Sequence, residues 1–238
     1  MHFSETPIFT PFIIQKIRKK SNMRMRKKRH GAERLQACAE FLAPEREITK
    51  ADAAAPFKNK DAEIHIEIGC GKGAFAVKNA ASRKNINFYA MEKVENVMIN
   101  ALEKAMARRD ECIDNLRFII GHAEELEEMF AEHSISVIYL NFSDPWPKKA
   151  HHRRRLTAPD RLETYKKLLR EGGRIIQKTD NVELYEYSLE QYAASGLKIT
   201  FHTNDLHASE RAATNITTEY EENFLREGKP ICCIEVTV

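Results

Sequence analysis

The sequence predicts an α/β fold with a seven-stranded, mostly parallel sheet whose final strand runs antiparallel. From about residue 63 onward, short apolar segments of strand length alternate with longer segments of helical period. A glycine-rich turn, residues 69–73, separates the first strand from the first helix. The last two apolar segments have no full helix between them, which favours an antiparallel end to a sheet that βα units otherwise make parallel.

Local signals place each element. Residues 63–68 (EIHIEI) alternate apolar and polar side chains as a strand does, and Thr157 or Asp160 is expected to cap a helix that Gly172 and Gly173 end. The expected strands are residues 63–68, 86–91, 116–120, 137–142, 174–178, 197–202 and 231–238. The expected helices are residues 74–81, 94–108, 123–130, 183–194 and one that runs from the cap to about residue 170.

Length and composition indicate one large domain with an appendage. The chain has 238 residues, of which 42% are hydrophobic, enough for a sizeable core. Residues 1–60 are basic, contain four prolines and show no clear period, which predicts an extended or partly disordered N-terminal arm. Residues 61–238 are expected to form the folded domain.

The charges are distributed unevenly. The net charge is only +3, but residues 6–32 hold nine Lys/Arg and no acid, and residues 148–155 hold five more. The remaining chain has 24 Lys/Arg against 35 Asp/Glu. An acidic body with two basic segments favours a nucleic-acid partner.

Cysteine usage and the N-terminus bear on location. The five cysteines include no Cys-x-x-Cys spacing, so neither a disulfide framework nor a metal site is expected, and a reducing cytoplasm is favoured. The apolar segment 8–14 is interrupted by Pro11 and is too short to span a bilayer, so no export or membrane role is predicted.

The glycine turn is expected to bind a cofactor. Gly69, Gly71 and Gly73 follow the carboxylate of Glu67, and a carboxylate at that edge suits an amine or another cation better than a pyrophosphate. Glu92 ends the second strand, where it could bridge ribose hydroxyls. A sulfonium cofactor carrying an amino acid therefore fits better than a dinucleotide, although a glycine turn can also serve only to pack a helix on a strand.

Residues 141–157 (NFSDPWPKKAHHRRRLT) combine a stiff acidic turn with a dense basic run. Prolines flank Trp146, the only tryptophan, and restrict the backbone around it and Asp144. An acid beside an aromatic ring is suited to holding a flat base, and the basic run is suited to phosphate.

These segments resemble the bacterial tRNA (guanine-N7)-methyltransferases. The motifs that carry the resemblance are residues 67–73 (EIGCGKG), 141–148 (NFSDPWPK) with its HHRRR tail, 178–180 (KTD), 218–224 (TEYEENF) and 228–231 (GKPI). The match runs from about Met23 to the C-terminus. The glycine motif is common among methyltransferases, whereas the DPWPK segment is specific.

The resemblance implies a Rossmann-like class I fold that uses S-adenosylmethionine to methylate N7 of guanosine 46 in tRNA, as a monomer or a homodimer. Asp144 is implied as the catalytic residue that orients the base and stabilises developing positive charge. The implied cofactor residues are Glu67, Gly69, Gly71, Gly73, Glu92, His122, Ala123 and Asp144. The implied tRNA residues are Lys148, Asp180, Thr218, Glu219, Tyr220 and Glu221, with a basic patch of Lys149, His151, His152, Arg153, Arg154 and Arg155.

Several of these residues have simpler explanations. His122 stands where the family more often has Asp or Asn, so it could be structural rather than an adenine contact. Asp180 could cap the following helix, and Thr218 with Glu221 has the form of a capping box. Tyr220 and Phe224 lie four residues apart and could simply pack a helix.

Three other functions are weighed. An adenine-N6 methyltransferase has a related Asp/Asn-Pro-Pro-aromatic turn, but Asp144 is followed by only one proline before Trp146. A non-enzymatic RNA-binding protein would have no need of Glu67 and the glycines. A Rossmann dehydrogenase leaves the basic run unexplained.

Overall fold

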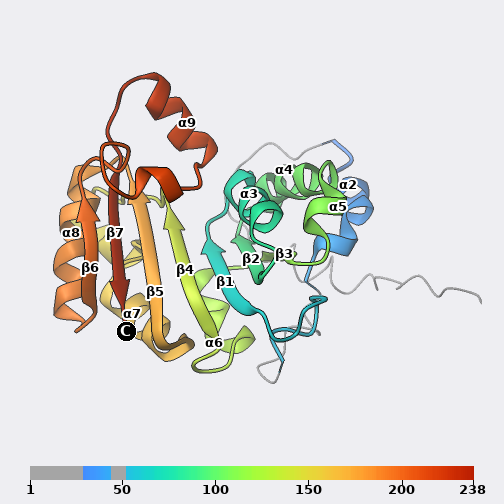
Figure 1. Cartoon of the computed structure of the whole chain (residues 1–238), viewed down its shortest axis with the longest axis horizontal. Coiled ribbons are helices and arrows are strands. Elements are labelled where there is room, and N and C mark those ends of the chain that lie inside the picture. The colour runs from blue at the N-terminus through green and yellow to red at the C-terminus, as the bar shows by residue number, and fades with distance from the viewer. Residues whose placement is uncertain (1–28, 44–51) are drawn as a thin grey trace, which may run out of the picture.

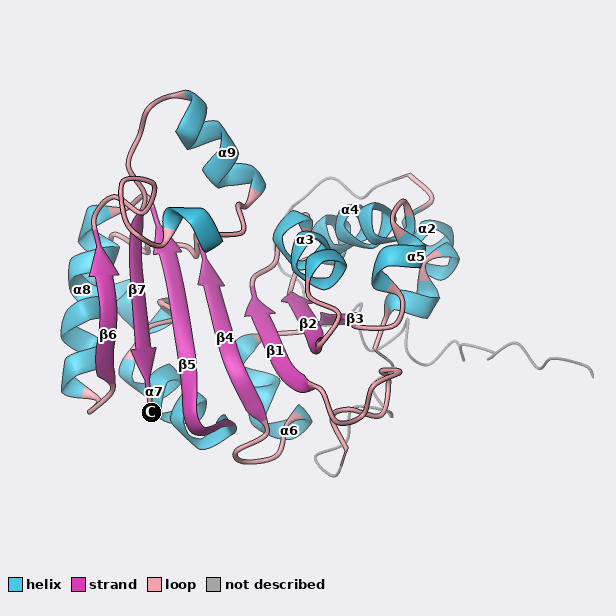
Figure 2. Cartoon of the chain, viewed as in Figure 1, coloured by secondary structure: helices cyan, strands magenta, loops and turns pink. Residues whose placement is uncertain are grey.

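The fold is built on one twisted seven-stranded sheet (Figure 2). The computed structural model describes residues 29–43 and 52–238. The strand order is β3-β2-β1-β4-β5-β7-β6, and only β7 runs antiparallel to its neighbours, so the predicted architecture is confirmed. The strands are β1 Glu63–Ile68, β2 Ile86–Glu92, β3 Leu116–Ile120, β4 Ile135–Asn141, β5 Leu169–Thr179, β6 Lys198–Thr203 and β7 Cys232–Thr237.

Helices cover both faces of this sheet (Figure 1). One face carries α2 Gly31–Ala37, α3 Ala74–Ser82, α4 Glu95–Met106 and α5 Arg109–Cys112. The other carries α6 Leu126–Met129, α7 Pro159–Leu168 and α8 Val182–Ala194. α9 Glu219–Arg226 stands at the carboxyl edge of the sheet, in the connection between β6 and β7. Short 3-10 turns are η1 Ala39–Phe41, η2 Ala123–Glu125, η3 Lys149–Arg154 and η4 Ala212–Thr214.

The alternation within β1 explains how this layering positions the site. Ile64, Ile66 and Ile68 belong to the apolar core under α6, α7 and α8. His65 and Glu67 therefore face the opposite side, where α3 packs. Burial of both faces is what a central parallel strand requires, and it places the Glu67 carboxylate inside the protein at the carboxyl end of β1.

The predicted N-terminal arm is wrong for residues 29–43 and for residues 52–60, where Ala53 and Phe57 are buried in the core. α2 contacts α4, Phe41 is fully buried, and Leu42 forms a bridge with Phe118 on β3. The rest of the predicted arm that precedes these residues, together with residues 44–51, lies outside the described residues. The packed segment was missed because a helix of seven residues carries little periodicity of its own.

Two boundaries around α7 also differ from the prediction. Pro159 occupies the first turn after an Ala158 N-cap, while the Thr157 hydroxyl lies 2.8 Å from that of Ser188. Gly172 and Gly173 do not end the helix, because β5 already begins at Leu169 and the glycines lie within an irregularity of its pairing with β4.

None of the helices in the described parts of the chain is both long and apolar enough to cross a membrane.

Candidate active site

Three acidic residues come together at the carboxyl edge of the sheet. β1 pairs with β2 on one side and with β4 on the other. The ends of these three strands therefore bring Glu67, Glu92 and Asp144, which follows β4, to the same edge of the sheet. Two cavities of about 630 Å³ and about 720 Å³ open there. Both are lined by Gly69, Val97 and Phe142, so the two cavities adjoin each other.

The glycine turn has two separable roles. Gly69, Gly71 and Gly73 all have left-handed backbones, with φ of 80°, 55° and 73°. A Cβ at Gly73 would lie 2.6 Å from the Cβ of Ala101, so this glycine allows α3 to pack against α4. Cβ atoms at Gly69 and Gly71 would meet no atom within 4 Å, and both residues line the smaller cavity. Their bare backbone is therefore available to a ligand.

Glu67 lies deep in the smaller cavity and is only half satisfied. Its Oε1 accepts a 2.9 Å hydrogen bond from Asn141 Nδ2, while Oε2 is buried without a partner among the described residues. Burial raises the pKa of Glu67 to about 7, against the opposing effects of Asn141 and Lys178. A ligand ammonium group would supply the missing partner and favour the ionised carboxylate. These residues fit an amino-acid-bearing cofactor.

Glu92 joins the glycine turn to the loop after β2. Its Oε2 accepts from the Gly71 N–H at 3.2 Å and its Oε1 from the Val94 N–H at 2.9 Å. Glu92 lines the larger cavity with His122 and Ala123, so three predicted cofactor residues do meet there. The His122 N–H is held by Glu125 at 3.0 Å, which fixes the backbone at this position.

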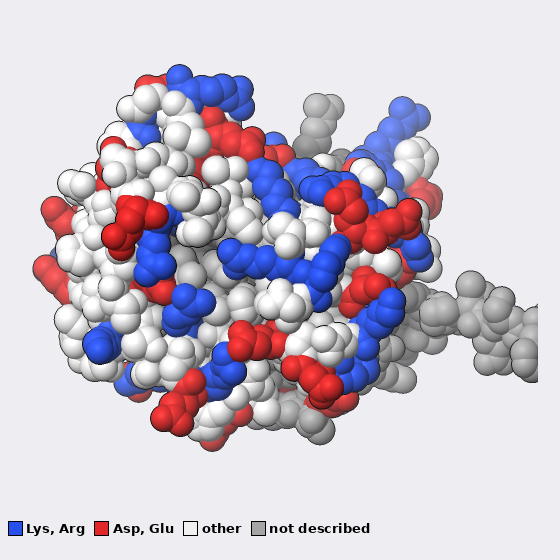
Figure 3. All heavy atoms as spheres, viewed as in Figure 1, with Lys and Arg blue, Asp and Glu red and all other residues white. Residues whose placement is uncertain are grey.

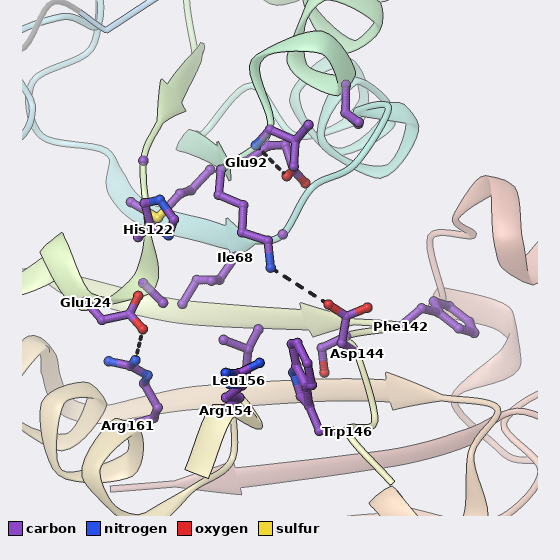
Figure 4. A pocket seen from close by; sticks show the side chains of 18 of the residues that line it. Ile68, Glu92, His122, Glu124, Phe142, Asp144, Trp146, Arg154, Leu156 and Arg161 are labelled. Atoms are coloured by element: carbon purple, nitrogen blue, oxygen red, sulfur yellow. Dashed lines mark hydrogen bonds and ion pairs between the residues drawn. The ribbon is translucent and has the colours of Figure 1, made fainter. Parts of the chain in front are cut away.

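Asp144 and Trp146 form one wall of the larger cavity, with Phe142 nearby and His122 on the far side (Figure 4). The Asp144 carboxylate is exposed, and its Oδ2 lies 3.8 Å from Lys93 Nζ. Phe142 and Trp146 have left-handed backbones with φ of 51° and 44°. Such conformations cost about 1–3 kcal/mol for bulky residues and concentrate at functional sites.

The basic run divides into a surface part and a buried part. Lys148, Lys149, Arg153 and Arg154 are exposed, and the guanidinium of Arg154 lies 4.9 Å above the Trp146 ring. His151 and His152 are half-buried, against Trp146 and Tyr187 respectively.

The prediction that Arg155 belongs to the basic patch is wrong. Its side chain is 1% exposed. Nε donates to the Pro145 carbonyl at 2.7 Å, Nη2 pairs with Glu183 at 2.6 Å, and the guanidinium lies 4.3 Å from the Tyr187 ring centroid. Arg155 therefore anchors the acidic turn to α8 rather than facing a ligand.

The segment 218–221 also divides. Thr218 and Glu221 form the capping box of α9, and Glu221 is fully buried in a 2.9 Å ion pair with Lys178. Glu221 lines neither cavity, and its role in binding tRNA stays a prediction. Thr218, Glu219 and Tyr220 line the smaller cavity. Tyr220 is mostly exposed and stacks on Phe142 with ring centroids 5.8 Å apart.

Two predicted substrate residues, Lys148 and Asp180, are exposed and line neither cavity. Asp180 does not cap α8, because Asn181 does so by accepting from the Leu184 N–H at 2.7 Å. Their role in binding tRNA stays a prediction.

Two site residues have no role in the sequence-based prediction. Asn141 orients Glu67, and Lys178 reaches Glu221 from the end of β5. Asn141 is the last residue of β4, and Lys178 is the last but one of β5. Their positions at strand ends next to the site were the signal by which the sequence could have revealed them. In the described ranges no group of three His, Cys, Asp or Glu could hold a metal ion.

The sequence of this chain is similar to those of known proteins over most of its length. The family model described as "Putative methyltransferase" matches residues 61–234. A tRNA (guanine-N(7)-)-methyltransferase of Listeria monocytogenes serotype 4b is 42% identical over 213 residues, which cover 90% of this chain and 97% of the relative. The protein of the same name from Brevibacillus brevis is 45% identical over 174 residues, covering 73% and 80%.

Solved structures share the fold. The 16S rRNA methyltransferase KamB has a TM-score of 0.55 at 15% identity, covering 74% of this chain and 87% of its own. A 16S rRNA (adenine(1408)-N(1))-methyltransferase with bound cosubstrate SAM has a TM-score of 0.51 at 12% identity, covering 89% and 92%. At such identities the likeness concerns the fold alone, which is that of class I methyltransferases. The sequence relatives are 42–45% identical over 73–90% of the chain, and by them this protein belongs to the tRNA (guanine-N7)-methyltransferase family.

Proposed function

We propose that this protein methylates N7 of guanosine 46 in the variable loop of tRNA. Guanine-N7 methylation of tRNA is the activity that its relatives' names state. The observation that carries the proposal is the half-satisfied Glu67 carboxylate, which lines a cavity next to the one lined by the exposed Asp144. One acid suits a cationic cofactor group and the other is open to a base.

The cofactor is S-adenosylmethionine, which supplies an electrophilic methyl group on a sulfonium. Glu67 would hold its amino group, and the backbone at Gly69 and Gly71 would lie against its methionine part. Glu92 would accept hydrogen bonds from the ribose hydroxyls, because each of its oxygens keeps a free lone pair beside one backbone donor. His122 and Ala123 would border the adenine.

Asp144 is proposed to orient guanine and to stabilise the positive charge that methylation places on its imidazole ring. N7 carries an in-plane lone pair and no proton, so no general base is needed and alignment is the main task. The Trp146 ring beside Asp144 offers a face for stacking a base, worth roughly 1–3 kcal/mol.

Lys148, Lys149, Arg153 and Arg154 are proposed to hold tRNA phosphates next to this cavity. We also propose a cytoplasmic location, since the substrate is tRNA and all five cysteines are free and buried. Either a monomer or a homodimer is compatible with a site built from one chain.

The test incubates purified protein with methyl-labelled S-adenosylmethionine and unmodified tRNA, and maps the label by borohydride reduction and aniline cleavage, which is selective for N7-methylguanosine. Cleavage at position 46 is the expected result. A matched transcript with adenosine at position 46 should take up no label. Label on an adenine amine would support the adenine-N6 alternative. Cofactor binding by calorimetry separates a non-enzymatic RNA binder, which should show none.

A further inference from the structure

A cationic cavity lies on the α3 face of the sheet, apart from the acidic site. Its volume is about 150 Å³, and it lies between α3, β5, β7 and the segment 206–216. Three arginines from three separate elements line it: Arg83 after α3, Arg174 on β5, and Arg211 before η4. Figure 3 views the molecule from this side and shows Lys and Arg side chains gathered across the middle of the face.

Few carboxylates neutralise these arginines. Arg174 pairs with Glu235 at 2.8 Å, and Arg211 lies 3.7 Å from the other oxygen of the same carboxylate. Arg83 donates to the neutral hydroxyl of Tyr139 at 3.2 Å, and no ion pair joins it to a carboxylate of the described residues. The cavity therefore holds more guanidinium than carboxylate charge.

A hydrogen-bond acceptor also lines this cavity. Asn79 is fully buried, and its Nδ2 donates to the Phe75 carbonyl at 3.1 Å. Its Oδ1 has no partner in the described part of the chain. A buried acceptor without a donor is costly, so the ligand that fits has a hydrogen-bond donor as well as anionic oxygens.

The cavity adjoins the proposed methyl-transfer site. Phe75 lines both this cavity and the smaller cavity of that site. Asn215 and Ile216 line this cavity and a shallow neighbour of about 430 Å³, to which Lys78 and Arg108 contribute. The arginine cavity therefore lies next to the proposed methyl-transfer site, with the buried Phe75 between the two.

We propose that the cavity at Arg83, Arg174 and Arg211 binds the sugar-phosphate backbone of the tRNA substrate, away from the nucleotide that is methylated. Arginine forks match phosphate oxygens in two-point hydrogen bonds, and a ribose hydroxyl supplies the donor that Asn79 lacks. An acidic peptide would also supply donors, from its backbone N–H groups, and tRNA is preferred because it is the substrate proposed for the neighbouring site. The inference rests on tRNA being the substrate.

The test compares Arg83→Ala/Arg211→Ala with the wild-type enzyme. Both side chains are outside the proposed cofactor and base contacts, and Arg174 keeps its pair with Glu235. We expect the KM for tRNA to rise about tenfold with kcat unchanged at saturating tRNA. The slope of log Kd against log salt should fall by about one to two, near one for each lost phosphate contact.

Arg109→Ala is the matched control, because that arginine is 48% exposed on α5 and pairs with Glu40. Cofactor affinity by calorimetry should be equal in all variants, which checks the fold and the acidic site. Arg211→Ala alone is the second variant, should the double variant unfold, and should show about half of the change in slope. A KM and a slope no different from those of the control would overturn the proposal.

The two proposals can fail separately. If the wild-type protein places no label on guanine N7 of tRNA, the proposed function fails whatever the arginine variants do. If it does place that label and the arginine variants bind tRNA as the control does, only the backbone site fails.

Discussion

At the scale of single residues, Asp144 is exposed to solvent and contributes little to the stability of the fold. Among the described residues its one ion pair is with Lys93, whose Nζ lies 3.8 Å from Asp144 Oδ2. The Asp144→Ala variant should therefore have the wild-type melting temperature. Its kcat should fall about 100-fold, which is the loss typical of removing one electrostatic contact to a transition state. Asp144→Asn keeps the shape without the charge and should lie between the two. Single-turnover rates and thermal melts measure this, and an unchanged kcat would remove Asp144 from the chemistry.

Glu67 should respond to pH in a defined direction. Burial raises its pKa to about 7, whereas a glutamate in an unfolded chain titrates near about 4.3. The folded protein thus retains a proton that the unfolded chain releases as the pH rises between these values. Without cofactor, Glu67 therefore costs stability increasingly from about pH 4 to pH 7, and by a constant amount above that.

Glu67→Gln removes this cost. The cofactor-free variant should gain stability over the wild type between pH 5 and pH 8, by about 3–4 kcal/mol at the upper end, in urea unfolding. It should also bind S-adenosylmethionine roughly 10- to 100-fold more weakly, because a charged hydrogen bond is lost. Glu171→Gln, at an exposed carboxyl on β5, is the control. Parallel stability profiles for wild type and Glu67→Gln would refute the shifted titration.

At the scale of elements, sequence-based prediction succeeded where a signal is local. The period of β1 and the glycines after it depend on neighbouring residues, and both were placed correctly. Arg155 is buried by Glu183, 28 residues away in the chain, and Glu221 by Lys178, 43 residues away. The sequence of the arginine run does not show which of its members packs against α8. The sequence predicted that the site lies at a set of strand ends, but it did not predict which side chains face the cavity.

The anchor between η3, the acidic turn and α8 depends on Arg155. Arg155→Ala removes its hydrogen bonds to the Pro145 carbonyl and to Glu183, which is half exposed. We expect a loss of about 2 kcal/mol and a fall in Tm of roughly 4–8 °C for a chain of this size. Arg153→Ala, which removes an exposed charge from the same run, should leave Tm unchanged in calorimetry. Equal melting of both variants would show that Arg155 is not an anchor.

α9 is held to β5 by the buried pair of Lys178 and Glu221. Burial lowers the pKa of Lys178, and Glu221 opposes that effect. Lys178→Met leaves an uncompensated carboxylate and should cost about 3–5 kcal/mol in urea unfolding. Lys178→Met/Glu221→Leu should recover most of that loss. Additive losses in this double-mutant cycle would contradict the coupling.

At the scale of the whole molecule, the small net charge of +3 is the sum of basic segments and an acidic remainder. Arg153 and Arg154 line the larger cavity, and the exposed Lys148 and Lys149 precede them in the same basic run, within a chain whose remaining parts are acidic on balance. Such an arrangement attracts a polyanion to one side and repels it elsewhere. The nine Lys/Arg of residues 6–32 lie almost wholly outside the described residues, so binding is best measured on the full chain.

Affinity for tRNA should therefore fall steeply with salt, and the exposed arginines should account for a measurable part of that slope. Arg153→Ala/Arg154→Ala should lower the slope of log Kd against log salt by about two, near one for each phosphate contact. Lys58→Ala/Arg109→Ala removes the same charge from exposed ion pairs with Asp114 and Glu40, and should leave the slope nearly unchanged. Binding by fluorescence anisotropy across a salt series measures both. Equal slopes for the two double variants would mean that net charge, rather than the position of the basic run, governs the encounter with tRNA.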